Sequence, residues 1–130
     1  MNTNLYKLED LQTIKDKAKR YCALFKTKND DPFYKNAEEL LIMVMLIKKS
    51  INPNLTFGRI LNDIGDNPNE WVAVEMNKVA NDSFFKDKKD EYLPVFESLI
   101  CVPQRTLKDA TICLREDFAG IINEFAIPRR

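Results

Sequence analysis

The sequence predicts an all-helical (all-α) fold, a compact bundle of about six helices around a central buried helix. Apolar residues recur at helical spacing along the chain, and no segment alternates apolar and polar residues as a half-buried strand does. Only three glycines occur, and short stretches rich in Pro and Asn separate the segments. An unbroken apolar run at 40–47 supplies a core on which the other helices can pack.

The length of 130 residues predicts a single domain, 1–130, whose core needs neither disulfides nor metals. The formal net charge is zero, so no overall field favours nucleic acid or an anionic membrane. The cysteines Cys22, Cys101 and Cys113 are scattered and odd in number, which is typical of reduced thiols that act as small buried hydrophobes. We therefore expect a cytoplasmic domain held together by apolar packing.

The residues that enzymes commonly use are missing. The chain contains no histidine, which excludes Ser-His-Asp and Cys-His catalysis and HExxH zinc sites. No glycine begins a phosphate-binding loop, and no CxxC pair offers zinc ligands. Adjacent carboxylates such as Glu38 and Glu39 point about 100° apart on a helix, so they make no facing acid–base pair. We expect no enzymatic activity, no cofactor and no metal.

The first predicted helix runs from about Leu5 to Lys26. It is locally basic, and Lys15, Lys19 and Arg20 are candidates for contact with the phosphates of DNA. The alternative is an ordinary solvated face, because the basic residues do not all share one side of the helix. Helical spacing is kept by Leu8, Leu11, Ala18, Cys22 and Phe25.

The second predicted helix, Pro32–Lys49, contains the apolar run 40–47. That run is far shorter than the ~20 residues that cross a bilayer. A buried strand of this length is possible, but the flanks favour a helix. Asp31 suits the N-cap and Pro32 the first helical position, and Lys48 is a cation in the last turn. Because its middle is apolar on all sides, we expect this helix to be buried on all sides.

Two shorter helices follow. Thr56 is the expected N-cap of the third helix, and Gly65 its expected left-handed C-cap. The turn "GDNPNE" then leads to a fourth helix that begins at Pro68 or Asn69. The residues expected in its core face are Trp71 or Val72, Met76 and Val79.

The last third of the chain predicts two more helices. The stretch 84–102 is helical in pattern but contains Pro94, so a kink or a break is expected at Leu93. The final helix ends before Pro128. Its heptad-like apolar stripe consists of Leu107, Ala110, Leu114, Phe118, Ile121 and Phe125.

Three stretches, in order, resemble one known family over most of residues 28–128. "DPFYKNAEELL", "LTFGRILNDI" and "RTLKDATICLREDFAGIINEFAIP" are similar to stretches of the all-helical domain of TraG/TraD-type coupling ATPases of type IV secretion and conjugation systems. The family often has Trp where Tyr34 stands, and a serine-rich start where the last helix has Ala110–Cys113. The alternative is a purely structural role, in which Phe33 and Tyr34 anchor the start of a helix to the core.

The resemblance implies a domain inserted in a RecA-like motor whose own motifs are absent here. The parent would be a membrane-anchored hexameric ATPase at the cytoplasmic face of the bacterial inner membrane. This part would make no membrane contact. It would recognise secretion substrates or their adaptor or chaperone proteins.

The stretch from Asn62 to Asn77 is acidic and contains no Lys or Arg. Export signals presented to coupling ATPases are often basic tails, so the resemblance implies that an acidic rim here could attract them. Surface solubility is the alternative interpretation. The candidate partner-binding residues are Asp63, Asp66, Glu70, Trp71 and Glu75. The function hypothesis is therefore substrate or adaptor recognition, and the rival is a DNA-binding domain that uses the basic first helix.

Overall fold

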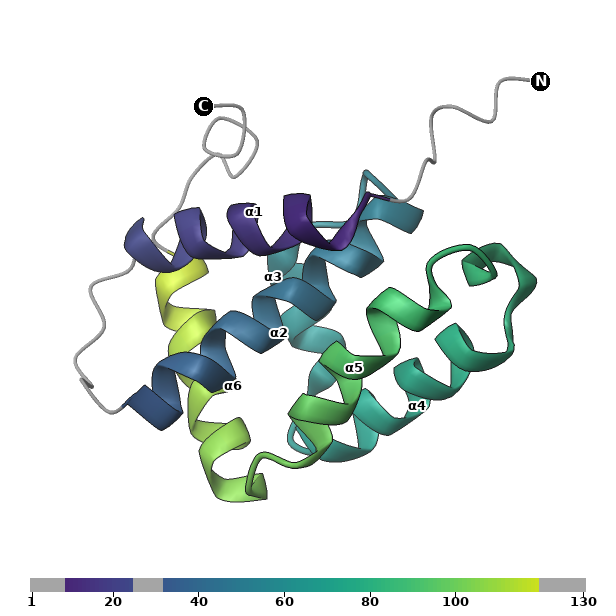
Figure 1. Ribbon diagram of the computed structural model, residues 1–130. Helices are drawn as coiled ribbons and strands as arrows, with labels where there is room; N and C mark the ends of the chain where they lie inside the picture. The colour runs from purple at the N-terminus through teal and green to yellow at the C-terminus, as the bar shows by residue number, and fades with distance from the viewer. Residues whose placement is uncertain (1–8, 25–31, 120–130) are drawn as a thin grey trace.

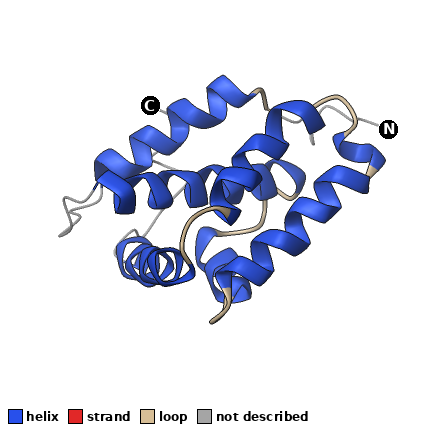
Figure 2. Ribbon diagram, turned by 60° about the horizontal axis from the view of Figure 1, so that its bottom comes forward, coloured by secondary structure: helices blue, strands red, loops and turns tan. Residues whose placement is uncertain are grey.

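The computed structural model describes residues 9–24 and 32–119, and within them every regular element is helical (Figures 1 and 2). This confirms the predicted all-helical bundle. The elements are α1 (Leu11–Leu24), α2 (Pro32–Ile51), α3 (Phe57–Ile64), α4 (Pro68–Asn81), the short 3-10 helix η2 (Ser83–Phe85), α5 (Lys89–Ile100) and α6 (Gln104–Ala119). No helix among the described residues has the length and apolar character needed to cross a membrane.

Helix α2 is the centre of the bundle, as predicted. All residues from Leu41 to Ile47 are buried, and Leu40 is partly buried. The helix packs against α1, α5 and α6, which surround it in Figure 1. Burying each of these side chains contributes roughly 1.5–3 kcal/mol before conformational entropy is counted. The helix continues to Ile51, slightly beyond its predicted end.

An aromatic cluster joins α1, α3 and α6. The ring centroids of Phe57 in α3 and Phe118 in α6 lie 4.5 Å apart in a stacked arrangement. Tyr21 of α1 packs edge-on to Phe57 at 5.0 Å and lies 5.7 Å from Phe118. Aromatic pairs in such geometries add to the free energy gained by burial alone, so the cluster fixes α3 and α6 relative to α1.

The turn between α3 and α4 forms much as predicted. Thr56 caps α3, since its hydroxyl accepts a hydrogen bond from the Arg59 N–H at 3.1 Å. Gly65 ends α3 with φ of 63°, although its ψ of −144° lies outside the left-handed helical region. The guanidinium of Arg115 in α6 donates hydrogen bonds to the carbonyls of Leu61 and Gly65, at 3.0 and 2.9 Å. These bonds satisfy carbonyls that the end of α3 leaves free.

Two predicted helix boundaries are wrong. Helix α1 starts at Leu11 rather than at Leu5, because the Asp10 carboxylate accepts a hydrogen bond from the Thr13 N–H at 2.8 Å and caps the helix there. The stretch after residue 84 is not one helix, since η2 and a turn precede α5. Asp31, the side chains of Phe33 and Tyr34, and the predicted C-terminal positions Ile121, Phe125 and Pro128 lie outside the described residues.

A kink or a break was expected at Leu93, and the structure shows no break there. Helix α5 continues through Pro94, whose ring lies on the exposed side. Proline removes one helical hydrogen bond, but the buried face of the helix spans the proline on both sides. That face consists of Tyr92, Val95, Phe96 and Leu99. Its packing outweighs the local cost of Pro94.

The three cysteines differ in exposure. Cys22 and Cys113 are partly buried and pack against the core, whereas Cys101 is exposed. The expectation that all three act as buried hydrophobes is therefore wrong for Cys101, which forms the C-cap of α5. Burial, together with the nearby carboxylates of Glu39, Glu38 and Asp117, raises the pKa of the Cys22 thiol to about 12. A thiol with so high a pKa stays protonated and is a poor nucleophile.

Candidate functional site

Four of the five predicted partner-binding residues line one hollow beside the α3–α4 turn. The hollow has a volume of about 360 Å³. We call it the acidic pocket and define it by Asp63, Asp66, Glu70, Trp71 and Val74. The three carboxylates are exposed, Trp71 is partly buried, and the Val74 side chain is 49% exposed. The pocket thus combines negative charge with apolar surface.

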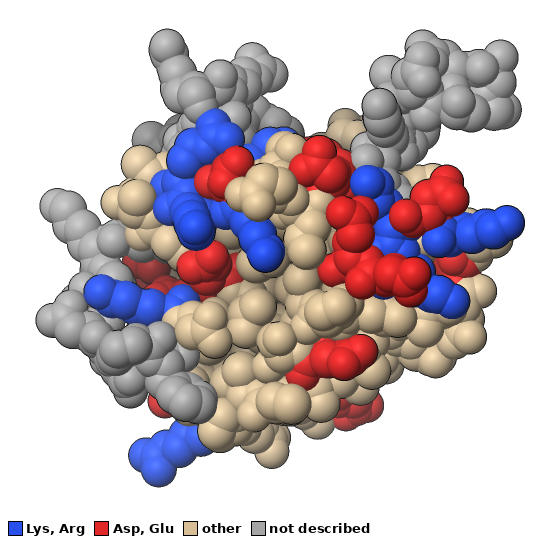
Figure 3. Space-filling view, viewed as in Figure 1, with Lys and Arg blue, Asp and Glu red and all other residues tan. Residues whose placement is uncertain are grey.

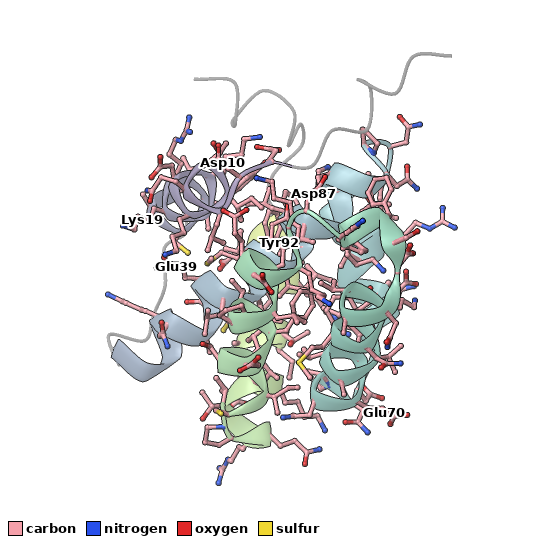
Figure 4. The ribbon with its side chains drawn as sticks, turned by 45° about the vertical axis from the view of Figure 1, so that its right-hand side comes forward. Asp10, Lys19, Glu39, Glu70, Asp87 and Tyr92 are labelled. Carbon is pink, nitrogen blue, oxygen red and sulfur yellow. The ribbon has the colours of Figure 1, made fainter. Side chains whose placement is uncertain are left out.

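The start of α4 positions the Glu70 carboxylate. Asn67 is the N-cap, and its side-chain oxygen accepts a hydrogen bond from the Glu70 N–H at 3.4 Å. Its amide nitrogen donates to the Glu70 carboxylate at 2.9 Å, which closes a reciprocal cap. Glu70 lies at the N-terminal end of α4 in Figure 4. Negative charge is favourable there, because the first turn of a helix carries a positive partial charge.

The other two carboxylates of the acidic pocket belong to Asp63 and Asp66. Within residues 9–24 and 32–119, neither Asp63 nor Asp66 makes a hydrogen bond or ion pair through its side chain. Both are exposed, Asp63 in the last turn of α3 and Asp66 on the following turn. A cationic ligand would therefore displace no protein group from them.

The structure separates Glu75 from the acidic pocket. On an α-helix, five residues correspond to a rotation of about 140°, so Glu75 faces away from Glu70. It is 8% exposed and accepts from the ammonium groups of Lys48 at 3.0 Å and Lys78 at 3.2 Å. Its predicted place on an exposed rim is therefore wrong, because its charge is already matched by two lysines.

Trp71 lies between the acidic pocket and the ion pairs of Glu75. Its ring contributes to the acidic pocket, and it also packs against the core. The ammonium of Lys48 lies 5.6 Å from the ring centroid, within the range of a cation–π contact. The indole thus has one side turned to the bundle and another to the pocket.

The sequence analysis missed a larger hollow further along α4. It has a volume of about 550 Å³ and lies between the C-terminal ends of α2 and α4, η2 and α5. We call it the apolar groove. Its apolar lining consists of Ile47, Ile51, Leu55, Val79, Phe84, Phe85 and Phe96, and Lys48, Glu75 and Lys78 also border it. Phe84 is 44% exposed. The adjacent pair Phe84–Phe85 was the available signal, since a helix cannot bury both rings on one face.

The candidate DNA-contact residues are exposed but do not share one face. Lys15 and Lys19 are one turn apart on α1, whereas Arg20 points about 140° away from Lys15. Asp16 lies between them, and its carbonyl accepts a hydrogen bond from the Arg20 Nε at 3.4 Å. Lys17 pairs with Glu9 at 2.8 Å. Figure 3 shows the blue side chains over α1 with red ones among them, so the basic surface is interrupted.

A buried carboxyl group, Glu38, was also missed. It is 4% exposed, and its Oε2 accepts no hydrogen bond from any residue that the structure describes. Burial, and next the nearby Asp117 carboxylate, raises its pKa to about 7 against the opposing effect of Lys35. Its spacing from Leu41, Ile42 and Met45 places it on the core stripe of α2, which was the signal in the sequence. Among the described residues, no three His, Cys, Asp or Glu side chains are arranged to hold a metal ion.

The surface around α4 therefore offers exposed carboxylates, one indole face and an apolar groove. Comparisons of the chain with protein-family models, with curated proteins and with solved structures gave no match.

Proposed function

We propose that this chain is a protein-recognition domain that binds a basic segment of a partner protein in the acidic pocket. The observation that carries the proposal is the pair of exposed carboxylates, Asp63 and Asp66, without ion partners in the described structure, beside the partly exposed ring of Trp71. Three carboxylates raise the local concentration of a cationic segment and speed its capture. A bound Lys or Arg could also stack on the indole.

The resemblance to the all-helical domain of TraG/TraD-type coupling ATPases gives this recognition a context. In that context, the domain is not itself an enzyme. It binds secretion substrates, or their adaptor or chaperone proteins, on the cytoplasmic side of the membrane, for a motor elsewhere in a hexameric parent. The helical bundle around α2 is compatible with this assignment, and the resemblance of the three quoted stretches is its basis.

A charge-reversal experiment tests the acidic pocket. The probe is a fluorescent lysine-rich peptide, and binding is followed by anisotropy over a range of salt concentrations. The double variant Asp63→Lys/Asp66→Lys should weaken binding by at least about tenfold, or about 1.4 kcal/mol. The matched control is Asp87→Lys/Asp90→Lys, which reverses two exposed charges near the start of α5. If the two variants weaken binding equally, only net charge matters and the pocket is not the site.

A second candidate function is DNA binding by α1, favoured by the exposed Lys15, Lys19 and Arg20. Duplex DNA is the probe. Binding through phosphates should fall steeply with salt, and Lys15→Glu/Lys19→Glu should abolish it. If the acidic-pocket variant strengthens DNA binding as much as the α1 variant weakens it, the effect is one of net charge, and α1 is no specific contact.

A further inference from the structure

Helix α1 is attached to the bundle chiefly through α2. Figure 1 shows it at the edge of the bundle, and among the described elements only α2 makes an extensive contact with it. Helix α6, by contrast, packs against α2, α3 and α4. The aromatic cluster and a hydrogen bond from the Tyr92 hydroxyl to the Glu9 carbonyl, at 2.6 Å, also hold α1. A change in the α1–α2 contact should therefore release α1 before it separates α6 from the other helices.

Glu38 lies where α2 meets both α1 and α6. Its carboxyl group is close enough to the Cys22 thiol of α1 and the Asp117 carboxyl of α6 for the charges to interact. The side chain is buried, and its Oε2 accepts no hydrogen bond from the described residues. A carboxyl group in such a place is most stable as the neutral acid, because ionisation would bury a charge that neither water nor a donor solvates.

The charged groups around Glu38 do not offset the cost of its ionisation. Burial is the largest cause of its raised pKa of about 7, the Asp117 carboxyl adds to it, and Lys35 opposes it only in part. Cys22, the titratable residue that α1 places beside Glu38, is a neutral thiol, because burial and the carboxylates of Glu39, Glu38 and Asp117 raise its pKa. The ionised carboxylate is therefore relieved only if water reaches it, and the movement of α1 would admit water.

We infer that Glu38 is a pH-dependent switch for α1: the neutral acid lets α1 pack on α2, and loss of its proton to water favours a form in which α1 is detached while α2 to α6 stay folded. In the detached form Glu38 is hydrated and has its ordinary pKa of 4.5, whereas in the packed form its pKa is about 7. The equilibrium constant for detachment therefore rises with pH between about 4.5 and about 7 and is level above that range. This inference is independent of the proposed function, because the acidic pocket lies at the α3–α4 turn.

The test is hydrogen exchange of the full chain, read by mass spectrometry for peptides from α1, α5 and α6 and corrected for the intrinsic effect of pH on exchange. At each pH, α1 should have a larger opening constant than α5, and low urea should barely change it, because local opening exposes little surface. Between pH 5 and pH 7 the opening constant of α1 should rise by about tenfold or more. Glu38→Gln should remove most of this rise. Glu39→Gln, which changes the next and less buried carboxyl group, is the matched control and should keep it.

Three outcomes would overturn the inference. If α1 and α5 share one opening constant at every pH, Glu38 affects only the unfolding of the whole bundle and there is no separate switch. If the rise persists in Glu38→Gln, another group controls the attachment of α1. If α6 opens together with α1, the element that detaches is not α1 alone. None of these outcomes bears on the acidic pocket, whose charge-reversal test is separate.

Discussion

The ammonium of Lys48 and the carboxylate of Glu75 form an ion pair at 3.0 Å that joins the central helix α2 to α4. The Lys48 side chain is 21% exposed and that of Glu75 is 10% exposed, so the pair is largely shielded from water. Each charge has lost much of its hydration, and each depends on the other to offset that loss. Removing either member should therefore cost more folding stability than removing one member of a surface pair.

Glu75→Gln should destabilise the fold by about 1–2 kcal/mol, because it leaves the poorly hydrated Lys48 ammonium without its counter-charge. Lys78→Gln is the matched control. It removes the other partner of Glu75, but Lys78 is 60% exposed and an exposed pair contributes less than about 1 kcal/mol. Urea unfolding measures both. Equal losses in the two variants would show that burial does not set the strength of these contacts.

The two glycines near α3 should respond to alanine with opposite signs. Gly65 has a φ of 63°, so Gly65→Ala should cost about 1 kcal/mol or more. Gly58 lies inside α3, and a Cβ placed there would come no closer than 4.0 Å to another side chain. Gly58→Ala should therefore stabilise the protein by about 0.4–1 kcal/mol. Thermal unfolding distinguishes these outcomes, and a gain from Gly65→Ala would contradict the geometry of the turn.

The buried Glu38 should make stability depend on pH. Its folded-state pKa of about 7 lies above the usual value of 4.5, so between these pH values the folded protein binds more protons than the unfolded chain. Stability should therefore fall as the pH rises from about 4.5 to about 7, and the Glu38 contribution should be level above that range. Glu38→Gln should remove most of this slope and gain about 1–2 kcal/mol at pH 8 relative to the wild type.

Urea unfolding at a series of pH values measures this effect, and Glu39→Gln is the control. Glu39 is the next residue on α2 but is less buried than Glu38. The Glu39→Gln variant should therefore keep the wild-type dependence of unfolding free energy on pH. A slope that persists unchanged in Glu38→Gln would assign the pH dependence to other carboxyl groups, such as Asp117, whose pKa is also raised by burial.

The sequence alone predicted the features that depend on local chemistry. The apolar run at 40–47 identified α2 as the buried helix, and Thr56 and Gly65 marked the two ends of α3. A run of acidic residues without lysine or arginine located the acidic pocket. Each of these signals is contained within a few neighbouring residues, so no knowledge of tertiary packing was needed.

The features that the sequence did not reveal depend on contacts between distant segments. The apolar groove combines the ends of α2 and α4 with η2 and α5. Glu75 is not on the predicted exposed rim, because it is buried against α2 and pairs there with Lys48. Pro94 indicated a break, but packing on the opposite side keeps α5 continuous. The burial of Glu38 likewise becomes apparent only when α2 is surrounded.

Arg115 gives the bundle a mechanical connection. Its guanidinium donates hydrogen bonds to the backbone carbonyls of Leu61 and Gly65. Helix α6 is therefore tied directly to the last turn of α3, which carries Asp63, and to the following turn, which carries Asp66.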